Sequence, residues 1–137
     1  MQGKKIFITA KDMRRLRDLI HGGLNLSDNQ RQYSMQLARE LDHSEVVDSQ
    51  DIPNHIVTMN SKVKFRDLDT NEIYAYNLVY PSFANADKNK ISILAPVGMA
   101  LLGYGVGDVI EWPVPAGIRR FKIEEVLYQP EAAGDDF

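Results

Sequence analysis

Histidine, serine and cysteine are the residue types most often used as nucleophiles, proton carriers and metal ligands, and this chain has few of them in useful patterns. It contains no cysteine and three histidines, His21, His43 and His55. Their spacings of 22 and 12 residues give no shared helical face, and no thiolate can complete a zinc site. No Gly-x-Ser-x-Gly sequence indicates a nucleophilic serine. We therefore predict no catalytic residue, no metal and no cofactor.

Two loops resemble ligand-binding motifs and then depart from them. Residues 67–72 place acids at alternate positions like a calcium loop, but Glu72 stands where glycine is needed and Leu78 where a bidentate glutamate is needed. A hairpin turn stabilised by Asp and Asn side chains explains this segment better. Residues 103–108 are rich in glycine, but they follow an expected helix and precede an expected strand, the reverse of a phosphate-binding loop. We interpret both segments as turns.

Basic side chains cluster in one place, at Lys11, Arg14, Arg15 and Arg17. This cluster could face an acidic partner or nucleic acid, or it could be a solvated helix face on which Arg14 pairs with Asp18. The formal net charge of the chain is -3, which disfavours a protein that holds nucleic acid mainly by neutralising phosphates. We expect at most weak, non-specific DNA contact through Lys11, Arg14 and Arg15.

Two predicted helices position these side chains in the first third of the chain. Thr9 begins a Thr-x-x-Asp capping pattern, which predicts a helix from the next residue to Gly22–Gly23. Ser27 and Asp28 can cap a second helix that runs to about His43. Apolar residues recur at helical spacing in both segments. Two amphipathic helices joined by so short a connection predict an antiparallel hairpin.

The connection between the helices forms the tip of this hairpin. Leu24 and Leu26 are apolar, and such residues at a loop tip either fold back onto the helices or meet a partner. Asp28 is the one carboxylate in residues 22–28, and we expect it to be engaged as a helix cap. The candidate tip surface consists of Leu24, Asn25, Leu26, Ser27 and Asp28.

The hydrophobic period changes after a polar linker at residues 47–54, which contains Pro53. A short helix is expected in the small, apolar segment 96–103, and the rest of this half reads as antiparallel strands. The expected strands are residues 56–59, 62–65, 73–80, 91–94, 109–112 and 121–128. The sequence thus predicts an α+β chain with a hairpin domain at 1–49 and a β-rich domain at 50–137. We expect a cytoplasmic monomer with no membrane partner, since no apolar run is long enough to span a bilayer.

A family signature lies in residues 91–112, which read ISILAPVGMALLGYGVGDVIEW. This run resembles the core signature of the carboxy-terminal domain of GreA and GreB, I-S-I-x-S-P-x-G-x-A-L-x-G followed by V-G-D, with Ala95 in place of the usual serine. Pro96, Gly98 and Gly103 match in order and spacing. Residues 57–65 and 128–135 are similar to one branch of this superfamily, the regulators of nucleoside diphosphate kinase, which residues 1–50 resemble in layout.

The resemblance implies an FKBP-like antiparallel sheet with one short helix. It also implies a bacterial transcription regulator that binds the RNA polymerase core at the rim of the secondary channel, with the coiled-coil hairpin directed toward that channel. In Gre factors the loop before the short helix touches the polymerase, and this loop corresponds to Leu94, Ala95 and Pro96. Of these three residues, Pro96 alone keeps the Gre pattern.

Gre factors carry acidic residues at the tip of a long coiled coil, where they help to hold a catalytic metal during transcript cleavage. The hairpin of this chain is short, because helices of about 13 to 16 residues span roughly 20 to 24 Å. We therefore expect a non-catalytic protein that competes with Gre-type factors without stimulating cleavage. Two alternatives stay open: a prolyl isomerase with Tyr104, Trp112 and Phe121 in an apolar cleft, and a direct protein regulator of nucleoside diphosphate kinase.

Overall fold

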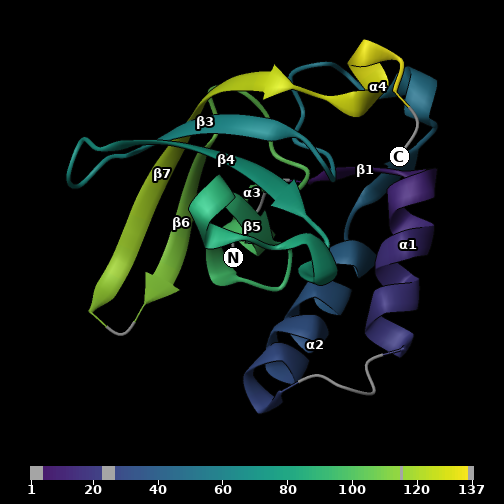
Figure 1. Ribbon diagram of the computed structural model, residues 1–137, viewed down its shortest axis with the longest axis horizontal. Coiled ribbons are helices and arrows are strands. Elements are labelled where there is room, and N and C mark those ends of the chain that lie inside the picture. Colours follow the sequence, from purple (N-terminus) through teal and green to yellow (C-terminus); the bar gives the residue numbers. More distant parts are fainter. Residues whose placement is uncertain (1–4, 23–26, 115, 136–137) are drawn as a thin grey trace.

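The computed structural model describes residues 5–22, 27–114 and 116–135, and its first elements form the predicted hairpin (Figure 1). They are strand β1 (Phe7–Thr9), helices α1 (Ala10–His21) and α2 (Asp28–Asp42), and strand β2 (Glu45–Val47). Both predicted helix starts are confirmed. Thr9 accepts the N–H of Asp12 at 3.1 Å, and Ser27 forms a reciprocal capping box with Gln30. Strand β2, which the sequence did not predict, pairs in parallel with β1 and so joins the two ends of the hairpin.

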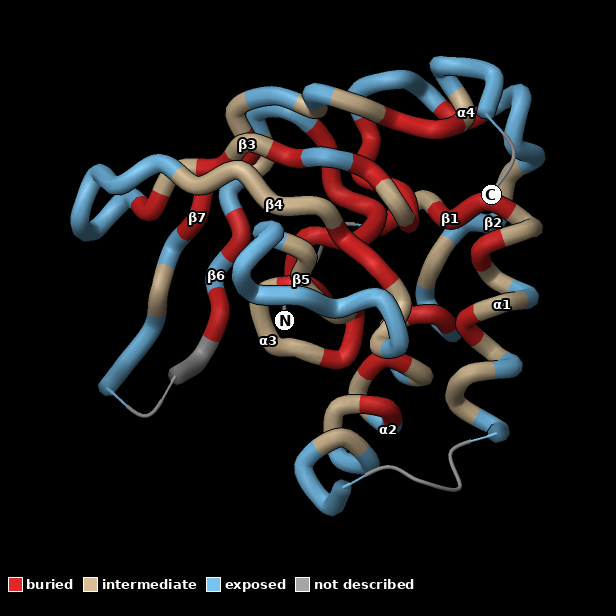
Figure 2. The backbone as a smooth tube through the Cα atoms, in the orientation of Figure 1, coloured by how far each residue is buried: buried red, intermediate tan, exposed pale blue. Residues whose placement is uncertain are grey.

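The hairpin shares its apolar core with the rest of the molecule. Leu16 of α1 and Leu37 and Leu41 of α2 are almost fully buried, and they belong to the same apolar cluster as Phe65 and Ile123 of the sheet. Figure 2 shows buried segments among intermediate and exposed ones along both helices. A pair of helices this short is marginal on its own in water, so this shared core is what stabilises the hairpin.

A five-stranded sheet in the order β5-β4-β3-β7-β6 forms the second half of the chain. Its strands are β3 (Lys62–Asp67), β4 (Ile73–Val79), β5 (Lys90–Ser92), β6 (Val109–Val114) and β7 (Gly117–Tyr128). Helix α3 (Pro96–Leu101), the predicted short helix, lies against β5 and β6. Gly98 permits this contact, because a Cβ atom there would lie 2.2 Å from the carbonyl oxygen of Ser92.

The sheet departs from the predicted antiparallel arrangement at one edge. Strand β5 runs parallel to β4, with Leu78 opposite Ile91. The connection between them contains two 3-10 turns, η2 (Pro81–Phe83) and η3 (Ala86–Lys88), and it carries the chain back so that β5 enters in the same direction. The strand ends earlier than the expected residue 94, since Ile93 and Leu94 turn into the core.

Residues 56–59 do not form the predicted strand. Ile56 makes an isolated bridge to Gly105, and Thr58 and Ser61 close a turn in which the Ser61 hydroxyl accepts the N–H of Thr58 at 2.9 Å. Burial explains the apolar composition of this segment without a strand, because Val57 and Met59 are both core residues. The period of an apolar run this short does not distinguish a strand from another kind of buried segment.

The turn between β3 and β4 is confirmed as a hairpin turn. The buried Asp67 accepts the N–H groups of Asp69 and Thr70, and Asn71 adopts a left-handed conformation with φ of 69°. The other carboxylate oxygen of Asp67 pairs with Arg119 of β7. This pairing lowers the pKa of Asp67, so the carboxylate stays ionised in the fold.

The polar linker is tied to the end of the chain. It contains a 3-10 turn, η1 (Ser49–Asp51), which contacts helix α4 (Pro130–Ala133). The Gln129 side-chain amide donates to the carbonyl oxygens of Pro53 at 2.9 Å and Ile56 at 2.8 Å. Apolar packing runs across residue 50, and the domain boundary there stays a prediction.

Replacing Leu37 by alanine should lower the free energy of unfolding by about 2 to 5 kcal/mol, because Leu37 is 1% exposed within the shared core. The matched control is Met35→Ala on the same helix. Met35 is 64% exposed, so its loss should change stability by less than about 0.5 kcal/mol. Urea unfolding followed by circular dichroism measures both. Equal effects of the two substitutions would contradict a core that includes the hairpin.

Candidate functional site

The loop before α3 holds the predicted docking residues in two different environments. Leu94 is 2% exposed, and its N–H is bonded to the Ser92 hydroxyl at 3.0 Å. Ala95 is the N-cap residue of α3, and Pro96 follows as its first residue, where a missing N–H costs nothing. The side chains of Ala95 and Pro96 are half-buried and reach the surface. Leu94 therefore supports the loop from the core, and the other two residues are available to a partner.

An apolar groove of about 420 Å³ lies beside this loop. It is bounded by Ala95, by Tyr76 in the middle of β4, by β5 and by the connection that contains η3. The lining residues are Tyr76, Ala84, Asn85, Ala86, Asn89, Lys90, Ile91, Ser92 and Ala95. Phe83, in the neighbouring turn η2, is 65% exposed. Small side chains that leave a groove beside an exposed aromatic ring are typical of a surface that binds another protein.

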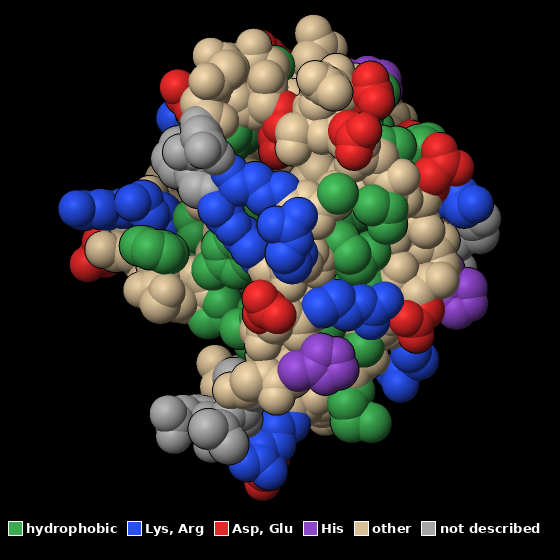
Figure 3. All heavy atoms as spheres, turned by 90° about the vertical axis from the view of Figure 1, so that its right-hand side faces the viewer, with side chains coloured by type: hydrophobic (Ala, Val, Ile, Leu, Met, Phe, Trp, Pro, Cys, Tyr) green, Lys and Arg blue, Asp and Glu red, His purple; other side chains and the backbone are tan. Residues whose placement is uncertain are grey.

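The basic residues of α1 do not form one uniform patch. Figure 3 shows the side of the molecule that carries α1, where Lys and Arg side chains gather near the centre below several Asp and Glu side chains. Arg14 is exposed, whereas Lys11 and Arg15 are half-buried and line a pocket together with Glu131 and Asp135. Two of the three predicted basic residues therefore lie among acids, which weakens their attraction for an anionic partner.

The tip of the hairpin is described only in part. Leu24, Asn25 and Leu26 lie outside the described residues. Ser27 is the N-cap residue of α2, and Asp28 is exposed in the first helical turn. The expectation that Asp28 serves as the cap is therefore wrong, because the Ser27 hydroxyl accepts the N–H of Gln30 in its place.

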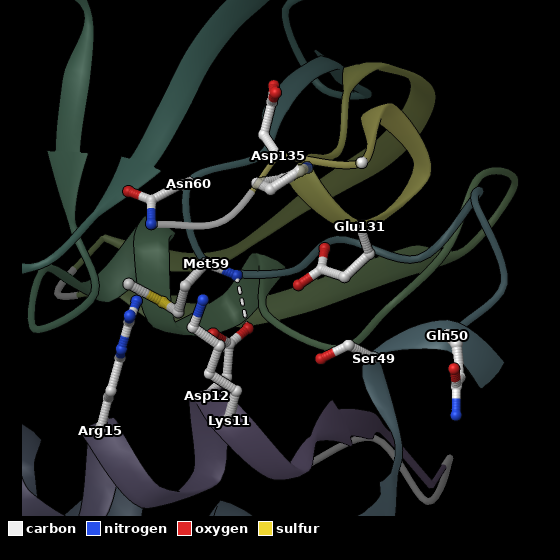
Figure 4. Close-up of a pocket in the computed structure, with 11 residues that line it drawn as sticks. Lys11, Asp12, Arg15, Ser49, Gln50, Met59, Asn60, Glu131 and Asp135 are labelled. Atoms are coloured by element: carbon white, nitrogen blue, oxygen red, sulfur yellow. Dashed lines mark hydrogen bonds between the residues drawn. The ribbon is translucent and has the colours of Figure 1, made fainter.

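A buried carboxylate lies in the pocket between α1 and α4, which encloses about 290 Å³ (Figure 4). Asp12 of α1 is 4% exposed, and its Oδ2 accepts the N–H of Met59 at 3.1 Å. The Glu131 carboxylate of α4 points toward Asp12 and accepts the Thr58 hydroxyl at 2.7 Å. Lys11 and Arg15 extend from α1 on the other side of the pocket. Helix α1, the 57–61 turn and α4 thus meet around two carboxylates.

The surroundings of Asp12 make its ionisation unfavourable. Burial raises the pKa of its carboxyl group to about 6, and the nearby Glu131 adds to this shift. The Met59 N–H and the charge of Arg15 act in the opposite direction. Near neutral pH the fold therefore holds a buried negative charge whose solvation is incomplete.

Sequence reasoning interpreted Asp12 as the acid of a capping pattern and missed its role. Its carboxylate bonds to Met59, 47 residues later, instead of completing a capping box. The missed signal was its position four residues before Leu16, since helical periodicity places both on the buried face.

The described ranges contain no group of three or more His, Asp and Glu side chains arranged to hold a metal ion. In the same ranges, no helix combines the length and apolar character needed to cross a membrane.

Two family models match different parts of the chain. Residues 52–128 match the family model described as "Transcription elongation factor, GreA/GreB, C-term", and residues 4–47 match "Rnk N-terminus". A structure titled "Prokaryotic transcription elongation factor GreA/GreB from Nitrosomonas europaea" is similar, with a TM-score of 0.73 and 45% identity; the match covers 91% of this chain and 99% of that one. The sheet, α3 and the loop before it are thus those of a GreA/GreB-type C-terminal domain.

Similar named proteins identify the family more narrowly than the two family models do. A "Regulator of nucleoside diphosphate kinase" from Escherichia coli K12 is 39% identical over 140 residues, which is 98% of both chains. A "Transcription elongation factor GreA" from Clostridium botulinum (strain Eklund 17B / Type B) is 41% identical over 92 residues, covering 67% of this chain and 58% of that relative. The chain therefore belongs to the family of regulators of nucleoside diphosphate kinase.

The buried Asp12 predicts a defined pH dependence of stability. Its folded-state pKa of about 6 exceeds the ordinary value of 3.8, so between these values the folded state binds more protons than the unfolded state. The contribution of Asp12 to the free energy of unfolding is therefore fully present below pH 4 and falls by up to about 3 kcal/mol as the pH rises through 6.

The measurement is urea unfolding at a series of pH values for the natural chain, for Asp12→Asn and for the exposed Asp18→Asn on the same helix. The stability difference between the natural chain and Asp12→Asn should change across pH 4 to 6, and Asp18→Asn should follow the natural chain. A difference that stays constant with pH would contradict the raised pKa of Asp12.

Proposed function

We propose that this protein binds the core of RNA polymerase at the rim of the secondary channel as a non-catalytic regulator, and that it competes there with Gre-type factors. The observation that carries the proposal is the surface formed by Ala95, Pro96 and the adjoining groove, in the loop through which Gre factors touch the polymerase. Relatives named as transcription elongation factors support the same partner.

The chemistry of this surface favours an apolar contact. Five of the groove's nine lining residues are alanine, isoleucine or tyrosine, and the other four are Asn85, Asn89, Lys90 and Ser92. Ala95 offers no hydroxyl where the Gre signature has serine, so a hydrogen bond from that position is absent. Docking would then rest on burial of apolar surface, and an acidic residue of the partner near Lys90 would orient it.

The hairpin argues against transcript cleavage. Helices α1 and α2 contain 12 and 15 residues, so they reach only about 18 and 22 Å. Residues 22–27 contain no Asp or Glu, and Asp28 lies in the first turn of α2. One carboxylate is a poor site for a catalytic Mg²⁺, which needs several oxygen ligands in octahedral geometry.

In competition with labelled GreA for core polymerase, the natural chain should displace GreA in a concentration-dependent way. Ala95→Arg places a long charged side chain at the groove and should weaken displacement at least about tenfold. Ala132→Arg adds the same side chain at an exposed position on α4, outside the groove, and should leave displacement unchanged. Failure of the natural chain to displace GreA, or equal behaviour of the two variants, would overturn the proposal.

The absence of cleavage has its own measurement. Purified protein added to a backtracked elongation complex should not shorten the transcript, whereas GreA added to the same complex should. Stimulated cleavage by this chain would contradict a non-catalytic role.

Direct regulation of nucleoside diphosphate kinase is a second candidate function, favoured by the name of the Escherichia coli relative. The two functions predict different partners. A tagged chain used to capture proteins from lysate should retain polymerase subunits under the first proposal. Retention of the kinase without polymerase would support the second.

A further inference from the structure

Helix α1 is attached to the second half of the chain through a polar contact that is separate from the apolar core. Asp12 accepts the N–H of Met59, in a turn held by hydrogen bonds between Thr58 and Ser61. Thr58 in turn donates to Glu131 of α4. We define Asp12, Met59 and Glu131 as the hairpin junction.

The charged and titratable groups around Asp12 come from three segments. Lys11 and Arg15 flank it on α1, Glu131 faces it from α4, and Tyr80 precedes η2, directly after β4. Asp135 lines the same pocket. With Asp12 ionised, three carboxylates share this pocket with two cationic side chains. A proton on Asp12 would leave one carboxylate for each cation.

We propose that the hairpin junction is a proton-controlled attachment, in which neutral Asp12 holds α1 against the 57–61 turn and ionised Asp12 favours local release of α1. The neutral carboxyl group can still accept the Met59 N–H through its carbonyl oxygen, and it removes the repulsion from Glu131. The ionised group is more stable in water than in this pocket. Opening the junction supplies that water.

The size of the effect follows from proton linkage. In the open junction Asp12 is solvated and titrates near its ordinary value of 3.8, whereas in the closed junction it titrates near 6. The equilibrium constant for opening should therefore rise roughly 30-fold between pH 4.5 and pH 7.5. Most of this change falls below pH 6, because above it Asp12 is ionised in the closed junction too. The junction would thus hold the hairpin more firmly in acid.

The chain is well suited to a direct distance measurement because it contains no cysteine. Arg14→Cys on α1 and Ile73→Cys on β4 replace exposed side chains, and both can carry nitroxide labels for double electron–electron resonance. At pH 7.5 the doubly labelled chain should show a population with a shifted or broadened distance, and that population should shrink at pH 4.5. With Asp12→Asn added, the closed distance should dominate at both pH values.

Two further variants test the assignment. Glu131→Gln removes the facing carboxylate and should reduce the open population at pH 7.5 without abolishing it. Asp18→Asn removes an exposed carboxylate of the same helix and should change nothing. A distance distribution that is the same at both pH values, or that shifts with pH equally in the Asp12→Asn chain, would overturn the proposal.

Hydrogen exchange separates local release from global unfolding. After correction for intrinsic rates, the amide of Met59 should open more readily at pH 7.5 than the amide of Phe65 in the central strand, and the gap should narrow at pH 4.5. Equal opening free energies at both pH values would refute local release. These measurements contain no polymerase, so they stand even if polymerase binding fails; the effect of the junction on hairpin orientation at the channel rests on the proposed function.

Discussion

Burial of the hairpin's apolar stripe against the sheet is the constraint on which the rest of this structure depends. Two helices of this length lack the apolar surface to persist alone, and Leu16, Leu37 and Leu41 are buried in the same apolar cluster as residues of the sheet. The same contact fixes the direction of the hairpin relative to the loop before α3. A protein that docks through that loop would therefore present its hairpin at the angle set by this contact while the hairpin junction is closed.

The groove beside the loop before α3 and the junction between α1 and α4 differ in their chemical character. The loop and groove at Ala95 are apolar and contain few charges, as suits a surface that a partner covers. The junction between α1 and α4 is polar and crowded with ionisable groups. Because the groove and the junction are separate, a change of pH that alters hairpin attachment under our proposal would leave the apolar docking surface unchanged.

Local signals in the sequence were sufficient for features that depend on neighbouring residues. Thr9 and Ser27 marked the helix starts, and Asp67 marked the β3–β4 turn, because each bonds to backbone groups two or three residues away. Features that depend on distant partners were not predictable in this way. Strand β2 exists through its pairing with β1, the direction of β5 follows from the path of its connection, and the carboxylate of Asp12 bonds to a turn 47 residues later. The groove at Ala95 is different, since all of its lining residues except Tyr76 lie within residues 84–95; its shape depends on how the β4–β5 connection folds back beside the loop before α3.

The order of strands in the sheet has a consequence for biosynthesis. Central strand β3 pairs on one side with β4, which follows within a few residues, and on the other side with β7, whose paired residues extend to Tyr128. As the chain leaves the ribosome, one edge of β3 must therefore stay unpaired until β7 has been made through Tyr128. The hairpin, although made first, must also wait for the core residues that it packs against. Translation thus delivers the elements in an order that delays folding to a single late step, in which the closing strand and the hairpin are stabilised together.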